Sequence, residues 1–165
     1  MSRTVDFQVE SAIGVEQIHA AYSEADYWVS RLAAYGDNGR LDAIDVVDGS
    51  VQVVTVQDLR TALLPKPFGK LYPRDLEIVQ DQTWTLVDGE LHGTVRIEAR
   101  GAPGSGRSSV VLAPAGDDTQ LRCTATVKVD VRFVGSTIEG MLSRQMVDDT
   151  PEMLRFTTEW LNEQA

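Results

Sequence analysis

The sequence predicts an α+β domain in which a curved antiparallel sheet of about seven strands wraps around a long C-terminal helix. Three patterns carry this prediction. Apolar residues alternate with polar ones near the N-terminus, the alternation returns in several segments up to residue 133, and an apolar stripe of helical period follows over residues 137–162. The expected order is one strand, two helices, six strands and one helix, within a single domain over residues 1–165.

The N-terminal part of the chain predicts a strand and a pair of short helices. Residues 4–10 alternate as a half-buried strand does, and a stripe of helical period follows. Ser23 is expected to cap the second helix, because its hydroxyl can accept a hydrogen bond from an N–H group of the first turn. This helix carries Trp28 and Leu32 on its apolar stripe and is expected to end at Gly36.

The central part of the chain predicts six strands joined by tight turns. Asp-Gly pairs at positions 48–49 and 88–89 each separate two alternating segments. Such pairs favour hairpins with primed turns, in which both central residues have positive φ. Further turns are expected at residues 101–106 and 115–118, and the last strand is expected to alternate without a break over residues 121–133.

A proline-rich segment, residues 63–73, interrupts the strands. Its three prolines and one glycine exclude a regular strand, because proline lacks the N–H group that a sheet ladder needs. Phe68 and Tyr72 lie in this segment. They are expected either to gate the mouth of a binding cavity or to anchor an ordinary surface loop.

The final segment predicts one long amphipathic helix. Its apolar residues fall near one face, while its acidic residues lie mostly off that face. Pro151 interrupts the pattern, because proline removes a backbone donor and crowds the preceding turn. Either one helix kinks at Pro151, or Asp149 or Thr150 caps a second helix there. The continuous apolar face favours one kinked helix.

Charge and composition argue against several classes of function. The net charge is −10 and lysine and arginine do not cluster, which argues against binding to nucleic acid or to anionic lipid. No apolar run has the length of a membrane span or the form of a signal peptide, so a cytoplasmic protein is expected. Cys123 stands alone and is expected to be a small buried residue rather than a reactive thiol. No cofactor and no metal are expected, because neither histidine belongs to a ligand cluster.

The order of elements, the short helix pair after the first strand and the sequence VGSTIEG at residues 134–140 resemble the START-like (SRPBCC) superfamily. This superfamily shares the helix-grip fold and includes birch pollen allergen relatives, lipid-transfer domains and polyketide cyclases. More narrowly, the chain is similar to an uncharacterised actinobacterial family within it. The resemblance covers nearly the whole chain. It implies a mostly hydrophobic cavity between the sheet and the C-terminal helix, with its mouth among the loops.

Strand parity and helical spacing select the residues that would line this cavity. Gly93 and Ala125 are small at inward positions, which leaves room, and paired methionines tolerate ligands of varied shape. Gln80, Gln82 and Gln145 are the polar candidates, which would bond either to a ligand or, alternatively, to each other or to buried water. The alternative is that the same residues fill a core. The predicted lining is Trp28, Leu32, Gln80, Gln82, Trp84, Leu86, Val95, Ile97, Ala125, Val127, Met141, Leu142, Gln145 and Met146.

Three functions stay open on the sequence. The first is a carrier or sensor that holds a hydrophobic or amphipathic small molecule, lipid- or polyketide-like, without catalysis. The second is an enzyme of cyclase or hydratase type that uses the same cavity, with Asp45 and Tyr22 as candidate catalytic residues. The third is a protein-interaction module with a filled core, which binds through its acidic last helix or through residues 65–73. A homodimer is also left open.

Overall fold

The computed structural model describes residues 2–34, 39–59, 76–101, 103–133 and 135–164, and these follow the predicted order of elements. The elements are β1 (Ser2–Ser11), α1 (Val15–Tyr22), α2 (Ala25–Ala34), β2 (Gly39–Val47), β3 (Ser50–Leu59), β4 (Leu76–Val87), β5 (Glu90–Arg100), β6 (Gly104–Ala115), β7 (Asp118–Val129) and α3 (Gly135–Gln164). None of the described helices combines the length and the apolarity that crossing a membrane requires.

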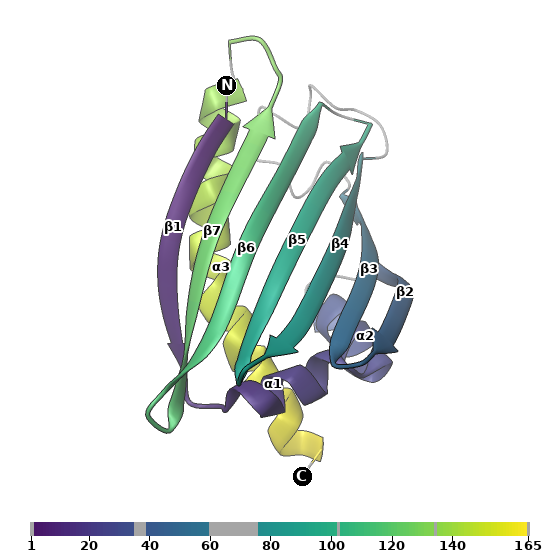
Figure 1. The fold of residues 1–165 in the computed structure, drawn as a ribbon. Coiled ribbons are helices and arrows are strands. Elements are labelled where there is room, and N and C mark those ends of the chain that lie inside the picture. The colour runs from purple at the N-terminus through teal and green to yellow at the C-terminus, as the bar shows by residue number, and fades with distance from the viewer. Residues whose placement is uncertain (1, 35–38, 60–75, 102, 134, 165) are drawn as a thin grey trace.

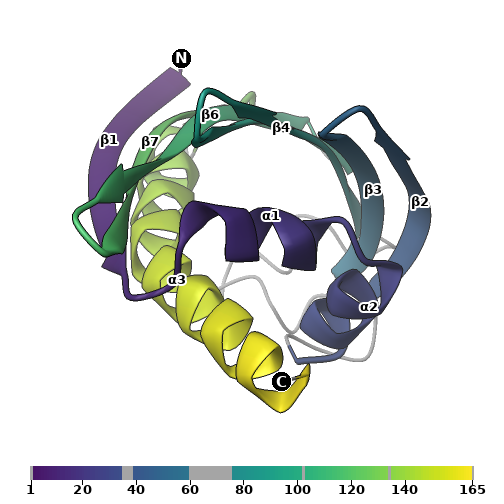
Figure 2. The same ribbon diagram turned by 60° about the horizontal axis from the view of Figure 1, so that its bottom comes forward.

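Seven strands form one antiparallel sheet in the order β1-β7-β6-β5-β4-β3-β2, so that β1 and β2 are its edges. Figure 1 shows the strands side by side, with α3 running along the part of the sheet that holds β1 and β7. Figure 2 shows the sheet curving around the helices, with α1 lying across its concave side. The concave side is called the inner face below, and the other side the outer face. The curved sheet around a long C-terminal helix confirms the predicted fold class.

The two predicted primed turns are confirmed. Asp48 and Gly49 have φ of 51° and 79°, and Asp88 and Gly89 have φ of 52° and 80°. Both central residues of each turn are therefore in the left-handed region that primed turns need. Each turn joins neighbouring strands, β2 to β3 and β4 to β5.

The last strand is shorter than predicted and its neighbour is longer. β6 begins at Gly104, inside the segment expected to be a turn, and Gly104 pairs with Val129. β7 ends at Val129, because both strands beside it, β1 and β6, reach no further along it. The alternation continues in the sequence, but after Asp130, whose N–H group donates to the carbonyl of Pro103 at 3.0 Å, no further strand pairing follows among the described residues. Phe133, the last apolar residue of the predicted alternation over residues 121–133, is 91% exposed and has φ of 72°.

The C-terminal helix is continuous across Pro151, as predicted. It begins at Gly135, two residues before the start that the apolar stripe indicates. Asp149 and Thr150 lie inside it, so the alternative of a second helix capped at these residues is wrong. The hydroxyl of Thr150 donates a hydrogen bond of 2.8 Å to the carbonyl of Met146, one turn earlier.

The junction between the two short helices differs in one detail. α2 begins at Ala25, and Ser23 belongs to the end of α1. Its hydroxyl donates a hydrogen bond of 2.8 Å to the carbonyl of His19. Ser23 therefore caps the C-terminus of α1 and not the N-terminus of α2. Gly36, the expected end of the second helix, lies outside the described residues.

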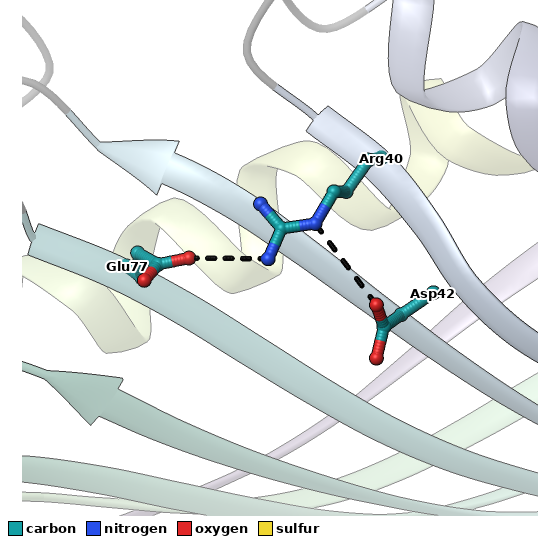
Figure 3. A network of polar contacts seen from close by, with 3 residues as sticks. All are labelled: Arg40, Asp42 and Glu77. Carbon is teal, nitrogen blue, oxygen red and sulfur yellow. Dashed lines mark hydrogen bonds and ion pairs between the residues drawn. The ribbon is translucent and has the colours of Figure 1, made fainter.

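A polar contact ties β2 to β4 across β3. Figure 3 shows Arg40 reaching from β2 toward Glu77, with 3.4 Å between Nη2 and Oε2, while its Nε lies 4.0 Å from Oδ1 of Asp42. The side chain of Arg40 is 57% exposed. Ion pairs in such exposed places contribute about 0–1 kcal/mol, so this contact orients the edge strand rather than holding the fold together.

Candidate functional site

The inner face of the sheet divides into two zones along its strands. Toward α1 lies the buried zone, which consists of Gln82, Trp84, Gly93, Val95, Ser108, Val110, Cys123 and Ala125. Toward the start of α3 lies the half-buried zone, which consists of Ile78, Gln80, Ile97, Ala99, Gly104 and Gly106. Three of its six residues are glycine or alanine. The sheet is thus covered at one end of its inner face and retains accessible surface at the other.

Aromatic rings pack between the buried zone and the helices. The ring centroid of Tyr22 lies 4.9 Å from that of Trp84 and 5.2 Å from that of Trp28. Tyr27 lies edge-on to Trp28 and Trp160, at 5.3 and 5.4 Å. Aromatic pairs in tilted or edge-on arrangements at such distances are favourable. Trp28 and Trp84, both predicted to line a cavity, therefore lie in a packed aromatic core.

The space beside Gly93 on the inner face is occupied by the side chain of Trp84. A Cβ atom built on Gly93 would collide with the six-membered ring of Trp84, the residue directly opposite on β4. The indole lies over the glycine, and it fills the space that a side chain would take. The expectation that Gly93 leaves room for a ligand is therefore wrong.

The amides on β4 form a chain with the indole. The Nε1–H group of Trp84 donates to Oε1 of Gln82 at 3.0 Å, and Nε2 of Gln82 donates to Oε1 of Gln80 at 3.1 Å. Gln82 is buried and its amide is used on both sides, as a buried polar group requires. Gln80 is half-buried, and its own NH₂ group donates to no acceptor among the described residues. The amide chain therefore ends, on the half-buried zone, in an NH₂ group with no acceptor among the described residues.

The first part of α3 covers β7 but not the strands beyond it. Ile138, Met141 and Leu142 form an apolar cluster with Val127 and Val129. Met146 also packs on this cluster and reaches the main core. Of the predicted lining, Val127 is thus buried under the helix, whereas Ile97, two strands away, keeps accessible surface.

The buried stripe of α3 includes residues that hydrophobicity does not mark. Ser143, Thr150 and Thr157 are buried, and their hydroxyls donate to the carbonyls four residues earlier at 2.8, 2.8 and 2.9 Å. A hydroxyl that bonds to its own helix can be buried without a further partner. Gln145, predicted to face the sheet, is exposed, because the buried stripe runs through these hydroxyl residues instead.

Asp45, a candidate acid of the cavity, lies on the outer face. The pairing of β2 with β3 shifts between Leu41 and Ala43. This bulge inserts one residue and reverses which later positions face inward. Ile44 therefore pairs with the buried Val53, and Asp45 next to it is exposed. Its predicted role as an acid in the cavity is wrong.

Tyr22, the second catalytic candidate, is buried in the aromatic core. Burial raises the pKa of its phenol far above the ordinary value, and the neighbouring Tyr27 raises it further, while Arg31 acts in the opposite direction. A phenol held neutral in this way is a poor general base near neutral pH. Its place between Trp28 and Trp84 assigns it to the packing of the helices on the sheet.

The remaining residues of the predicted lining lie in different parts of the structure. Val95 and Ala125 are buried in the sheet, and Leu86 is half-buried near the turn after β4. Leu32 of α2 lies against Gly39, where a Cβ atom would come within 2.9 Å of its side chain. Phe68 and Tyr72, the predicted cavity mouth, lie outside the described residues.

Cys123 is buried, 7% exposed, as expected for a structural residue. Burial raises the pKa of its thiol to about 11, so the thiolate is scarce at neutral pH. His92 contacts Glu90 on the surface, and His19 bonds to the carbonyl of Gly49. The part of the chain that the structure describes holds no group of three or more residues able to bind a metal ion.

Comparisons with known protein sequences find a family and relatives that cover almost the whole chain. A family described as "protein of unknown function (DUF2505)" matches residues 6–161. An uncharacterised protein of Mycobacterium tuberculosis is 32% identical over 170 residues, which cover 98% of this chain and 98% of that protein. This relative comes from the actinobacteria, as the resemblance in sequence implies.

Two solved structures show the same architecture. Norcoclaurine synthase from Thalictrum flavum is similar with a TM-score of 0.55 and 15% identity, over 99% of this chain and 88% of its own. A START superfamily protein from Mycobacterium smegmatis has a TM-score of 0.54 and 10% identity, over 98% and 99% of the two chains. At these identities the likeness concerns the fold alone, which is START-like as predicted.

Proposed function

The chain belongs to the DUF2505 family, and from this premise, together with its START-like fold, we propose that it binds a hydrophobic or amphipathic small molecule against the half-buried zone. The observation that carries the proposal is that the size and the accessibility of the side chains change along the inner face. Large rings cover the buried zone, whereas the half-buried zone has small residues and keeps accessible surface.

The space above the half-buried zone suits a ligand. A Cβ atom at Gly106 would lie 3.4 Å from the carbonyl oxygen of Thr126 and 3.7 Å from Cβ of Ile97, and one at Gly104 would meet nothing closer than 3.7 Å. These are ordinary contacts, in contrast to the collision at Gly93. The two glycines therefore have room for a Cβ atom that they lack, and we infer that a ligand can approach the backbone there.

The chemistry of the zone indicates the kind of molecule. Ile78 and Ile97 offer apolar contact, and Gln80 offers an NH₂ group that has no acceptor among the described residues. No charged residue belongs to the half-buried zone. A mostly apolar molecule with one carbonyl or hydroxyl oxygen fits this surface best, because one donor fixes its orientation while the rest is held by burial.

Norcoclaurine synthase provides a precedent for small molecules in this fold. Its structure has been solved in complex with dopamine and hydroxybenzaldehyde. In the present chain, Asp45 is exposed on the outer face and Tyr22 is buried in the aromatic core. Neither residue supports an acid–base enzyme, so binding is the function that we propose.

The test is native mass spectrometry of the purified protein in three forms. Gly106→Leu places an apolar side chain in the space above the half-buried zone. Ser109→Leu adds a similar side chain on the outer face of the same strand, where Ser109 is exposed, and serves as the matched control. We expect the unaltered protein and the control to retain a bound molecule after incubation with a panel of lipids and aromatic metabolites, and Gly106→Leu to lose it.

Thermal unfolding of the same proteins decides between an open and a filled interior. If the space is open, Gly106→Leu buries apolar surface and keeps or raises the stability, by up to about 2 kcal/mol. If the interior is filled, the extra side chain overpacks it and costs about 1–3 kcal/mol. A destabilised Gly106→Leu, together with no molecule retained by the unaltered protein, would overturn the proposal.

A further inference from the structure

A second surface feature lies between the edge strand and the last helix, outside the inner face. A groove of about 410 Å³ runs between β1 and α3 and is lined by Arg3, Thr4, Val5, Gly140, Ser143, Arg144, Val147 and Asp148. Figures 1 and 2 both show β1 and α3 side by side here. All of the lining comes from these two elements, so the groove is separate from the half-buried zone on β4, β5 and β6.

The side chains of Arg3 and Arg144 both contact Gly140 of α3. A Cβ atom at Gly140 would lie 2.6 Å from Nη1 of Arg3, so the guanidinium of Arg3 rests on the backbone where the glycine leaves space. Arg144, one turn later, donates from Nε to the carbonyl of Gly140 at 3.3 Å. Gly140 thus brings a cation from β1 beside a cation from α3, although the two are 141 positions apart in sequence.

Neither cation is neutralised within the part of the chain that the structure describes. No carboxylate lies within 4.0 Å of the guanidinium of Arg3 or of Arg144. Most of the described arginines form no ion pair, and what distinguishes these two is that both contact Gly140 and line the same groove. Two like charges side by side repel each other, and a bound anion relieves the repulsion.

The lining also sets the charge and form of the anion. Arg3 and Arg144 contribute two positive charges and Asp148 one negative charge, which leaves a net charge of +1. Val5 and Val147 add apolar surface. A singly charged oxyacid group with an apolar part matches both features, because a guanidinium binds two oxygens of such a group side by side.

We propose that the groove between β1 and α3 binds the carboxylate or phosphodiester group of a small amphipathic monoanion, held by Arg3 and Arg144. This site is independent of the ligand proposed for the inner face. The site could not be predicted from the sequence, because Arg3 approaches Gly140 and Arg144 only when β1 lies along α3.

The experiment is an NMR titration of the full chain at low ionic strength, in which the amide signals of Gly140, Ser143 and Val147 are followed. Hexanoate and dimethyl phosphate are the anionic probes, and hexan-1-ol and hexylammonium are the neutral and cationic controls. We expect saturable shifts with at least one anion and none with the two controls. The anion that binds more tightly shows whether a carboxylic acid or a phosphodiester is the natural source.

Four variants localise the binding. Arg3→Gln and Arg144→Gln are each expected to weaken it about tenfold, because each removes a charged hydrogen-bond donor. Gly140→Ala removes no charge but pushes the guanidinium of Arg3 aside, and it should weaken binding while the helix is as stable or more stable. Arg155→Gln, on an exposed part of α3 outside the groove, should change nothing.

Three results would overturn the proposal. The first is the absence of a saturable shift with either anion. The second is an affinity that survives Arg3→Gln and Arg144→Gln together. The third is an equal affinity for hexan-1-ol. Gly106→Leu separates the two sites, because it is expected to leave the anion titration unchanged while it abolishes binding at the inner face.

Discussion

The side chain of Glu139 ties the last helix to the last strand: its Oε2 accepts a hydrogen bond of 2.8 Å from the backbone N–H group of Val129. Glu139 is 2% exposed and lies in the second turn of α3, while Val129 ends β7. Val129 lies one residue past the last pair between β1 and β7, Ser2 with Lys128, and the carboxylate supplies an acceptor for its N–H group.

Removing this carboxylate is expected to destabilise the protein. Glu139→Ala leaves a buried N–H group without a partner, which costs about 1–3 kcal/mol of unfolding free energy. Glu139→Gln keeps an acceptor oxygen and should cost less. Urea unfolding measures both, with the exposed Glu163→Gln as control. Equal stability of Glu139→Ala and the unaltered protein would show that the contact contributes nothing.

Gly93 and Gly104 are expected to respond in opposite ways to alanine. Gly93→Ala forces the ring of Trp84 away and should cost about 1–3 kcal/mol, whereas Gly104→Ala has room and should be neutral or slightly stabilising. Tryptophan fluorescence should shift in the first variant only. If Gly93→Ala unfolds like Gly104→Ala, the close packing of the indole on the glycine is wrong.

The contact between Tyr27 and Thr157 is suited to a double-mutant cycle. The two hydroxyl oxygens are 2.6 Å apart in the core, and the Thr157 hydroxyl also donates to the carbonyl of Met153. We expect Tyr27→Phe and Thr157→Val each to lower the unfolding free energy, with a coupling of about 1 kcal/mol between them. A coupling of zero would mean that the two hydroxyls act independently.

Cys123 should make stability fall in alkaline solution. Burial raises the pKa of the thiol from 9.0 to about 11, with a smaller contribution from Asp6, while a hydrogen bond with Ser108 acts against it. Between these pH values the folded protein keeps a proton that the unfolded chain has lost, so stability is full below pH 9 and declines as the pH approaches 11. Urea unfolding at several pH values should show a shallower decline in Cys123→Ala. Parallel declines in the two proteins would contradict the raised pKa.

Phe133 holds a backbone conformation that suits another residue better. Its φ is 72°, and its ring is exposed apart from the guanidinium of Arg132, 5.4 Å from the ring centroid. Asparagine tolerates this conformation, so Phe133→Asn is expected to raise the unfolding free energy by about 1 kcal/mol and the Tm by about 2–4 °C. Phe133→Leu, which keeps the strain, should not. A lower Tm for Phe133→Asn would show that the phenyl ring stabilises the connection between β7 and α3.

Much of the fold follows from local patterns in the sequence. Alternation places β5 and β7 with the correct face inward, and Asp-Gly pairs fix two hairpins, because each signal depends only on neighbouring residues. The end of β7 could not be predicted, since it depends on where β1 and β6 stop. The bulge in β2 reverses the face of Asp45 for a similar reason, because strand pairing decides it.

The site was less accessible to prediction than the fold. The stripe on α3 was placed by hydrophobicity, which passes over Ser143, Thr150 and Thr157, although hydroxyls bonded to their own helix are buried at little cost. Parity selected Ile97 and Gln80 for the inner face correctly, but it does not distinguish the zone that aromatic rings cover from the zone that keeps accessible surface. That distinction depends on packing between elements far apart in the chain.

The indole lying on Gly93 also has a consequence for how such chains diverge. A substitution at position 93 is tolerated only when position 84 has already lost its large ring, and the reverse change leaves a void. The two positions should therefore vary together among related chains, with glycine accompanying tryptophan and larger residues accompanying smaller ones. Sequences from many genomes can reveal this co-variation without any protein being purified.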